Sequence, residues 1–301
     1  MPMVFSLDEL MAGFFPTTRT GYVGLLGYPL SGTLSPKLQN VAFRAMGLDN
    51  FYLPIEVQEE ERFKAIFEHM PLFGFVGTNV TMPWKEKVIE LLDELDESAS
   101  LCGAVNTVKF DGGRAIGYNT DGVGFVTSFV EAFGESPRGK SMLMLGAGGA
   151  ARAVAFYMLR EGISRLVVVN RSADRARALV ENLRSHFPGR VELMSMEDGG
   201  YRRRAREFDV IVNTTSVGMY KDPDSTLLIE EDFREGQLVC DVVYNPPKTR
   251  MLKEAERAGA RVLSGRGMVV HQAAKAFEIW TGVKPDVSLM FSVFDRHFGV
   301  S

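Results

Sequence analysis

The stretch that decides the fold reads Met142-Leu143-Met144-Leu145, then Gly146-Ala147-Gly148-Gly149-Ala150-Ala151, then a helical segment and Leu166-Val167-Val168-Val169. A Gly-x-Gly-x-x-Ala run between an apolar strand and a helix is the context in which this fingerprint binds a dinucleotide. Gly146 permits the tight turn, Gly148 lets the backbone approach a pyrophosphate, and Ala151 allows close helix–strand packing. The helix N-terminus adds N–H donors and the positive end of its dipole. The alternative is a tight turn without a ligand.

The residues that follow the second strand bear on which cofactor binds. A strand-end Asp or Glu usually holds the ribose 2′-hydroxyl of NAD, whereas an arginine accommodates the 2′-phosphate of NADP. Here the strand ends in Asn170, followed by Arg171, with Arg175 one helical turn later. The planar guanidinium donates paired hydrogen bonds to phosphate. These residues favour NADP over NAD; the alternative is a solvated arginine pair.

Composition narrows the class of protein. The chain has 301 residues, 46% of them hydrophobic, so it can bury a sizeable core, and its length suggests two domains. The net charge of −4 argues against a general nucleic-acid binder. Cys102 and Cys240 lie far apart without metal-ligand spacing, which indicates reduced thiols in a cytosolic protein. The four histidines are too scattered to suggest a metal site.

Neither a membrane segment nor a signal peptide is predicted. No apolar run approaches the ~18 residues that a spanning helix needs. Met1 to Thr20 carries Asp8 and Glu9 where a signal peptide would carry positive charge. We expect this segment to be a short helical or extended lead-in, and the protein to be cytoplasmic.

A hydroxyl-rich loop follows the first predicted strand, Tyr22 to Gly27. Pro36 suits the first turn of a helix that runs to about Met46, with Ser35 as its N-cap. On this interpretation Ser35 is only a cap and Thr33 only a turn residue. The functional alternative is that both hydroxyls face a small anionic ligand beside the helix N-terminus.

A second polar segment, Thr78-Asn79-Val80-Thr81-Met82-Pro83-Trp84-Lys85, follows an apolar stretch. Pro83 is expected to open a helix, because Val88, Leu91, Leu92 and Leu95 have helical spacing. Lys85 would then lie in the first turn, where the helix dipole disfavours a cation and favours the neutral amine. This placement is mild evidence that Lys85 has a role beyond an ordinary surface lysine.

Polar residues also interrupt the apolar segments farther along the chain. Asn106 lies in a predicted strand over residues 103–108, as a structural hydrogen-bonding group or a ligand contact. Asp121 precedes a helix that it or Thr120 would cap. Later strands end at residues 213–216 and 242–244, which we expect near the nicotinamide, because ligands lie beyond the carboxyl ends of the strands.

Taken in order, these segments resemble the shikimate dehydrogenase family over nearly the full chain. The matching segments are Ser35-Pro36, Asn79 to Lys85 (compare the family's N-V-T-x-P-x-K), Ala104 to Thr107, Asn119 to Gly122, Gly146 to Ala150, Asn170 to Ser172 and Gly267 to Ala274. Each segment alone is weak evidence, whereas their order and spacing together are specific.

The resemblance implies reversible, NADP-linked reduction of 3-dehydroshikimate to shikimate in aromatic amino acid biosynthesis. It implies an α/β substrate domain (1–122), a Rossmann-like NADP-binding domain (123–265) and C-terminal helices (266–301) that return to the first domain. The residues that it implies for each role follow. Lys85 and Asp121 form the catalytic pair, Thr33 and Ser35 bind the carboxylate, and Asn79, Thr81, Asn106, Tyr244 and Gln272 hold ring hydroxyls or the catalytic pair. NADP is bound by the glycine turn Gly146 to Ala150 and by Asn170, Arg171 and Arg175, and the nicotinamide is lined by Val242 and Gly265.

One departure from the family pattern concerns the carboxylate loop. Members usually carry Ser-x-Ser-Pro there, often with a histidine just before, whereas this chain has Gly32-Thr33-Leu34-Ser35-Pro36. The extra methyl group changes the space at the carboxylate, and one methyl typically shifts discrimination by ~1–3 kcal/mol. Two alternatives therefore stay open, a quinate or shikimate-like dehydrogenase of other preference and, more distantly, a non-catalytic NADP-binding sensor. The sequence also leaves open whether the chain forms a homodimer.

Overall fold

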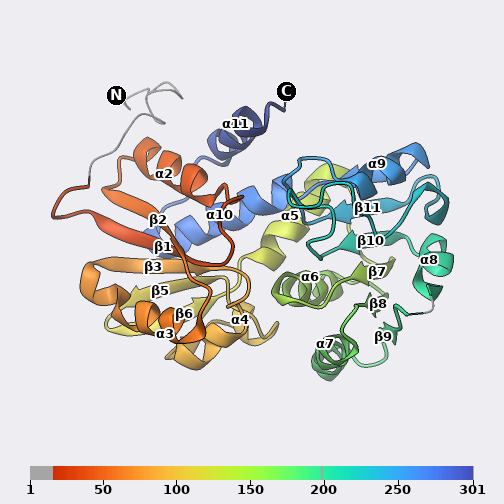
Figure 1. The fold of residues 1–301 in the computed structure, drawn as a ribbon, viewed down its shortest axis with the longest axis horizontal. Helices are drawn as coiled ribbons and strands as arrows, with labels where there is room; N and C mark the ends of the chain where they lie inside the picture. Colours follow the sequence, from red (N-terminus) through yellow and green to blue (C-terminus); the bar gives the residue numbers. More distant parts are fainter. Residues whose placement is uncertain (1–15, 198, 301) are drawn as a thin grey trace. The chain divides into compact units, whose positions relative to one another are not determined.

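The computed structural model describes residues 16–197 and 199–300. The expected lead-in from Met1 to Thr20 therefore lies mostly outside the described residues. The chain divides into two compact units, Met1–Thr120 with Val270–Ser301, and Asp121–Val269 (Figure 1). Each unit is built around its own sheet, so the fold is α/β as predicted.

The first unit contains a mixed six-stranded sheet with the order β2-β1-β3-β5-β6-β4. Strands β2, β1 and β3 are parallel to one another, whereas β5 is antiparallel to both β3 and β6, and β4 is parallel to β6. Its elements are β1 (Gly21–Gly27), α2 (Ser35–Ala45), β2 (Asn50–Glu56), α3 (Glu60–His69), η1 (Met70–Phe73), β3 (Phe75–Val80), η2 (Lys87–Leu91), β4 (Glu94–Leu95), α4 (Glu97–Ser100), β5 (Thr107–Asp111) and β6 (Arg114–Tyr118). The C-terminal helices are α10 (Arg266–Thr281), which belongs to this unit from Val270 onward, and α11 (Val287–Phe298).

Close packing of α10 against the sheet depends on a glycine. A Cβ added at Gly77 in β3 would collide with the Trp280 indole and with the Val108 carbonyl. Trp280 is buried, and its Nε1 donates a hydrogen bond of 2.9 Å to that same carbonyl. The absent side chain at position 77 thus makes room for the largest side chain of α10, which confirms that this helix packs on the first unit.

The second unit contains a parallel six-stranded sheet with the order β12-β11-β10-β7-β8-β9. In Figure 1 its strands succeed one another from β11 down to β9. Its elements are α5 (Asp121–Phe133), β7 (Ser141–Leu145), α6 (Gly149–Arg160), β8 (Arg165–Val169), α7 (Ala173–His186), β9 (Val191–Met194), α8 (Gly200–Arg204), η3 (Ala205–Glu207), β10 (Val210–Asn213), η4 (Glu230–Asp232), β11 (Leu238–Asp241), α9 (Arg250–Arg257) and β12 (Arg261–Leu263). The first three strands along the chain, β7, β8 and β9, are placed successively toward one side of the sheet, and the next three, β10, β11 and β12, toward the other. This is the strand order of the Rossmann fold, and the point at which the order changes side lies between β7 and β10.

The helix expected after Pro83 is not formed, so the argument from its dipole for Lys85 is wrong. Residues 82–86 turn, and only the short 3₁₀ segment η2 follows, before β4. An α-helix there would need carbonyls that other segments use. The Met82 carbonyl accepts from Tyr28 N at 2.9 Å, and the Lys85 carbonyl accepts from Val105 N at 2.8 Å. Val88 still reaches the core, where it is fully buried.

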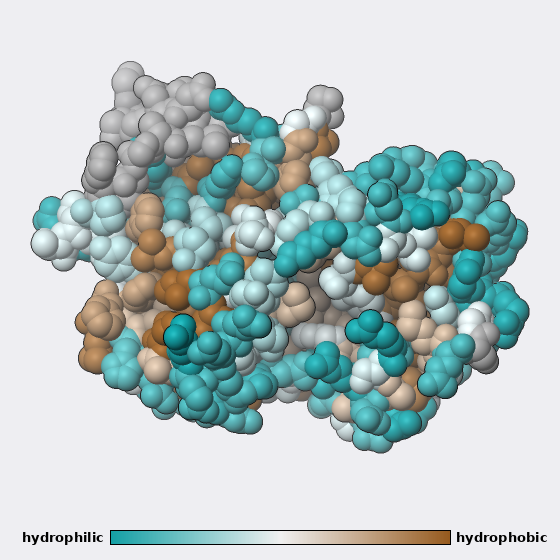
Figure 2. All heavy atoms as spheres, in the orientation of Figure 1, coloured by the Kyte–Doolittle hydropathy of each residue, from teal (hydrophilic) through white to brown (hydrophobic). Residues whose placement is uncertain are grey.

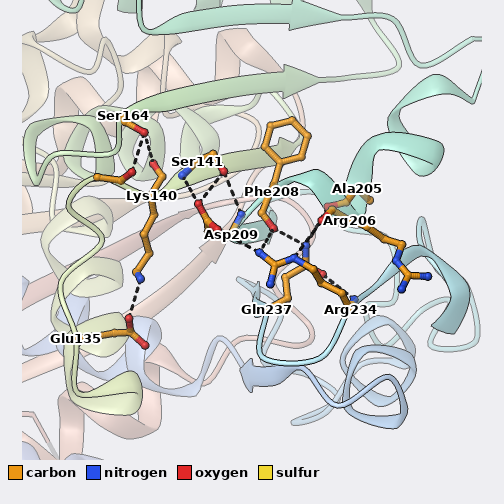
Figure 3. A network of polar contacts seen from close by, with 11 residues as sticks. Glu135, Lys140, Ser141, Ser164, Ala205, Arg206, Phe208, Asp209, Arg234 and Gln237 are labelled. Atoms are coloured by element: carbon orange, nitrogen blue, oxygen red, sulfur yellow. Dashed lines mark hydrogen bonds and ion pairs between the residues drawn. The ribbon is translucent and has the colours of Figure 1, made fainter.

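Asp209 links the strands of the second sheet at their amino-terminal ends (Figure 3). Its Oδ2 accepts hydrogen bonds of 2.9 Å from both Ser141 N and Ser141 Oγ, and its Oδ1 accepts one of 3.1 Å from Arg234. Burial works to raise the pKa of Asp209, but these bonds and the charges of Arg234 and Lys140 outweigh it and lower that pKa below 3.8. This carboxylate therefore stays ionised and joins β7 to the start of β10.

Asp241 lies at the opposite edge, where the strands end, and is only 1% exposed. Its Oδ1 accepts from Asn213 Nδ2 at 3.0 Å and Val243 N at 2.9 Å, and its Oδ2 accepts from Thr249 Oγ1 at 2.7 Å. Burial raises the pKa of Asp241 to about 7, although these three donors work to lower it. The side chain ties the end of β10 to the loop after β11.

Side chains on the surface are mainly polar. On the face drawn in Figure 2 hydrophilic residues predominate, and apolar ones gather in separate patches. In the described ranges no helix has the length and apolar character to cross a membrane. Across those same ranges no three His, Cys, Asp or Glu side chains group as metal ligands would.

The raised pKa of Asp241 predicts how stability varies with pH. The unfolded carboxyl has an ordinary pKa of 3.8 and the folded one about 7, so the folded state binds more protons between those values. The contribution of Asp241 to stability is therefore complete below the lower pKa and is lost as pH rises through the higher one. Asp241→Asn stays neutral, so from about pH 5 to about pH 8 it should gain on the order of a few kcal/mol relative to wild type. Denaturant unfolding across that range measures the difference.

Asp209→Asn is the matched control, because its carboxyl has the opposite shift. A lowered folded pKa contributes stability above the ordinary value and loses it only as pH falls through the folded value. The cost of Asp209→Asn should therefore stay constant over the same range. A constant difference between Asp241→Asn and wild type would contradict titration of Asp241.

Candidate active site

A network of buried amides and hydroxyls forms in the first unit where β3 ends and β5 begins. Asn79 Nδ2 donates to the Asn106 carbonyl at 2.9 Å and to Thr107 Oγ1 at 3.0 Å. Asn106 Nδ2 donates to Thr120 Oγ1 at 2.9 Å, and Asn106 Oδ1 accepts from Thr120 N at 2.8 Å. All four residues are at least nine-tenths buried. Polar groups are costly to bury unless they are hydrogen-bonded, so this network is well specified.

Lys85 and Thr81 lie in the turn after β3 and are both partly exposed. The turn is fixed at its centre by Trp84, which is buried and stacks on Phe63 with ring centroids 4.7 Å apart. Its backbone is fixed at both ends, because Thr81 N donates to the Leu26 carbonyl and the Lys85 carbonyl accepts from Val105 N. That second bond places the lysine backbone beside the residue that precedes Asn106.

Thr33 and Ser35 lie together at the start of α2, but not as predicted. The N-cap is Leu34, with no side-chain cap, and Ser35 is the first helical residue. Thr33 Oγ1 instead accepts from Ser35 N at 3.3 Å, so the threonine hydroxyl takes a backbone donor of the first turn. The expectation that Ser35 caps the helix is therefore wrong by one position, and both hydroxyls stay partly exposed.

The remaining substrate and catalytic candidates fall in different units. Gln272 lies on the part of α10 that belongs to the first unit, beside Ala273, whose carbonyl accepts from Gln39 Nε2 at 2.9 Å. Asp121 is the first residue of α5 in the second unit and is 5% exposed. Tyr244 follows β11 in that unit and is partly exposed.

The glycine turn of the second unit has the form that a dinucleotide needs. Gly146 has a φ of +118°, and a Cβ there would collide with Thr214 Oγ1, so only glycine fits. Gly148 is the N-cap of α6 and has no neighbour within 4 Å of an added Cβ. With Ala147, Gly149 and Ala150 these residues leave the helix N-terminus open to a phosphate, so the turn fits the pyrophosphate of NADP.

The end of β8 offers cationic side chains to a phosphate. Asn170 Nδ2 donates to the Ser172 carbonyl at 2.9 Å, which shapes the turn into α7. Arg171 and Arg175 are exposed, and within the described residues neither has an acidic partner. Arg177, two residues beyond Arg175, pairs with Asp174 at 2.6 Å. The two unpaired guanidinium groups fit the 2′-phosphate of NADP.

Val242 and Gly265 lie together at the carboxyl edge of this sheet. A Cβ added at Gly265 would collide with the Val242 carbonyl, and Gly265 N donates to the Val243 carbonyl at 3.1 Å. The backbone of the loop after β11 is thus packed directly on the segment before α10.

Sequence reasoning gave no role to two residues that the networks depend on. Tyr52 is buried in β2 and reaches Asn79, and Asp241 joins the end of β10 to the loop after β11. An aromatic residue inside a strand resembles an ordinary core residue. The signal for Asp241 was a charge within the apolar run Leu238 to Val243.

Family models match three parts of the chain. Residues 25–108 match the shikimate dehydrogenase substrate binding domain, residues 130–223 match shikimate / quinate 5-dehydrogenase, and residues 265–290 match the shikimate 5'-dehydrogenase C-terminal domain. The matched ranges fall in both units.

Individual proteins agree with these models. The chain is 45% identical over 280 residues to a shikimate dehydrogenase (NADP(+)) of Methanopyrus kandleri, covering 93% of this chain and 96% of that one. A crystal structure of a shikimate dehydrogenase in complex with NADP+ matches with a TM-score of 0.88 at 35% identity, over 95% and 99% of the two chains. A quinate dehydrogenase of Corynebacterium glutamicum in complex with NAD matches with a TM-score of 0.84 at 32% identity, over 91% and 98%.

The resemblance inferred from the short motifs is thereby confirmed, because identity at this level extends over nearly the whole of both chains. The chain belongs to the shikimate dehydrogenase family.

Proposed function

We propose that this protein catalyses the reversible, NADP-dependent reduction of 3-dehydroshikimate to shikimate. The observation that carries the proposal is the buried network of Asn79, Asn106, Thr107 and Thr120, which adjoins the Lys85 turn and directly precedes Asp121. A polyhydroxylated ring needs several fixed donors and acceptors, and this network supplies them in the family's motifs. The named relative, a shikimate dehydrogenase (NADP(+)), supports the same substrate and cofactor.

We further propose that residues 1–122 and 266–301 bind the substrate and residues 123–265 bind NADP. The family model of the substrate binding domain over residues 25–108 and the glycine turn of the second unit support this division. The buried, unbridged thiols of Cys102 and Cys240 support a cytoplasmic location, since reducing compartments keep thiols free.

When bound, the cofactor supplies the hydride acceptor or donor, and the protein supplies position and charge. As shikimate is oxidised, the hydride leaves the carbon that bears the reacting hydroxyl, and the hydroxyl proton must go to a base. Lys85 takes that proton in this proposal, and Asp121 orients the amine. The alternative role for Lys85, as a cation that stabilises the developing alkoxide, uses the same position.

The substrate carboxylate is proposed to bind Thr33 and Ser35. The ring hydroxyls would be held by Thr81, Gln272, Tyr244, Asn79 and Asn106. This chain has Thr33 where the family usually has a serine. One matching family model is that of shikimate / quinate 5-dehydrogenase, and one similar solved structure is a quinate dehydrogenase. A quinate or shikimate-like preference is therefore the second candidate.

A steady-state assay tests the proposed reaction. Shikimate and quinate are each oxidised with NADP and with NAD, and absorbance of the reduced cofactor is followed. We expect kcat/KM for shikimate with NADP to exceed the other three by orders of magnitude. Comparable use of quinate or NAD would favour the second candidate, and cofactor binding without turnover of either substrate would favour the sensor.

Lys85→Ala tests the proton-transfer role. Positioned proton transfer typically contributes about 10²–10⁴-fold, so kcat should fall by that factor with a smaller change in KM. Lys87→Ala is the matched control, because Lys87 lies two residues away on the surface and pairs with Glu60. Equal losses in the two variants would contradict a specific role for Lys85.

Arg171→Ala tests recognition of the 2′-phosphate. Loss of a hydrogen bond to a charged group costs about 1.5–3 kcal/mol, so KM for NADP should rise about ten- to a hundredfold while KM for NAD stays unchanged. Arg177→Ala, which removes a guanidinium already paired with Asp174, should leave both values unchanged. A parallel rise for NADP and NAD would show that Arg171 does not read the 2′-phosphate.

A further inference from the structure

Tyr52 is a buried phenol that contacts the polar network directly. It lies in β2, is 1% exposed, and its hydroxyl donates to Asn79 Oδ1 at 2.7 Å. In the sheet, Tyr52 pairs with Val23 and Asn79 pairs with Leu25, so all four side chains share one face. The phenol thus reaches diagonally across β1 to the end of β3.

The position of this phenol is fixed from two sides. Asn40 of α2 accepts from Tyr52 N at 2.7 Å and donates to the Tyr52 carbonyl at 3.0 Å. The ring packs against Trp280 with centroids 6.1 Å apart, and Trp280 is itself bonded to the Val108 carbonyl. The hydroxyl is therefore presented by a rigid backbone and a packed ring.

The hydrogen bonds around Asn79 have only one consistent direction. The Asn106 carbonyl can only accept, so the amide nitrogen of Asn79 must face it. The second amide hydrogen goes to Thr107 Oγ1, whose own proton is donated to Asn106 Oδ1 at 3.0 Å. Asn79 Oδ1 consequently faces Tyr52, which donates to it.

This direction limits what Asn79 can offer a ligand. Both of its hydrogens are used within the protein, whereas a carboxamide oxygen accepts two hydrogen bonds and Tyr52 supplies one. Asn79 can therefore bind a ligand only as an acceptor, and its natural partner is a hydroxyl group.

We propose that Tyr52 is a positioning residue: its hydroxyl holds the Asn79 amide so that the oxygen is aimed at a substrate hydroxyl. The inference rests on the proposed function, in which Asn79 contacts the ring of shikimate. Without the phenol hydroxyl, only the two bonds of the amide nitrogen hold the Asn79 carboxamide, and its oxygen loses the partner that fixes its direction. A ring hydroxyl would then meet an acceptor that is less well placed.

Tyr52→Phe removes the hydroxyl and keeps the ring that packs on Trp280. One hydrogen bond is worth about two- to tenfold in an equilibrium constant, so KM for shikimate should rise by that factor. KM for NADP should stay unchanged, and the shift in Tm that shikimate induces should become smaller in parallel. Tyr22→Phe is the control, because it makes the same change on β1, where the ring packs on Phe75, and it should leave KM for shikimate unchanged.

A double-mutant cycle with Asn79→Ala separates positioning from a general loss of stability. If Tyr52 acts through Asn79, Tyr52→Phe should add no further change in KM for shikimate to Asn79→Ala. Additive changes, or equal changes in Tyr52→Phe and Tyr22→Phe, would overturn the inference. Absence of shikimate turnover in the wild type would instead contradict the proposed function, so the two failures are distinguishable.

Discussion

The constraint on which both units depend is that amide and carboxyl groups buried at the ends of strands must be hydrogen-bonded within the protein. In the first unit Asn79 and Asn106 meet this constraint through Thr107, Thr120 and each other. In the second unit Asn213 and Asp241 meet it through Thr249 and the backbone of the following loop. An unpartnered group at these depths would cost roughly 1–3 kcal/mol, so the networks fix the loops in one arrangement.

Aspartates at the two ends of the strands in the second sheet have opposite pKa shifts. Asp209 is held ionised by Ser141 and Arg234 where the strands begin, and this edge serves stability. Burial raises the pKa of Asp241 to about 7 where the strands end, beside the loops proposed to meet the nicotinamide. When ionised, the Asp241 carboxylate accepts the hydrogen bond from Thr249, and when protonated the same carboxyl can donate one to the Thr249 hydroxyl, so the loop after β11 keeps this contact in either state.

The sequence predicted the parallel sheet well because its signals are local. A tight turn into a helix is predicted by the apolar strand followed by Gly146, Gly148 and the small residue Ala151, and the structure has that turn between β7 and α6. The prediction of a helix after Pro83 was wrong, because the helical spacing of apolar residues does not show which donors bond to the backbone carbonyls. There, Tyr28 and Val105, both distant in the sequence, take the carbonyls of Met82 and Lys85.

The site residues divide along the same line. Short motifs identified Asn79 and Asn106 as candidates, but which atom each presents depends on partners from other strands. Tyr52 illustrates the limit, because an inward aromatic residue in a strand carries no local sign that its hydroxyl meets an amide. Such roles become visible only once the register of β2, β1 and β3 is known.

The pairing of Gly77 with Trp280 has a consequence for how such chains can diverge. Position 77 has no room for a Cβ while an indole occupies position 280 and donates to the Val108 carbonyl. A smaller residue on α10 would remove only the clash with the indole, because an added Cβ would still collide with the backbone carbonyl of Val108. Glycine should therefore persist at position 77 among relatives even where the residue at position 280 differs.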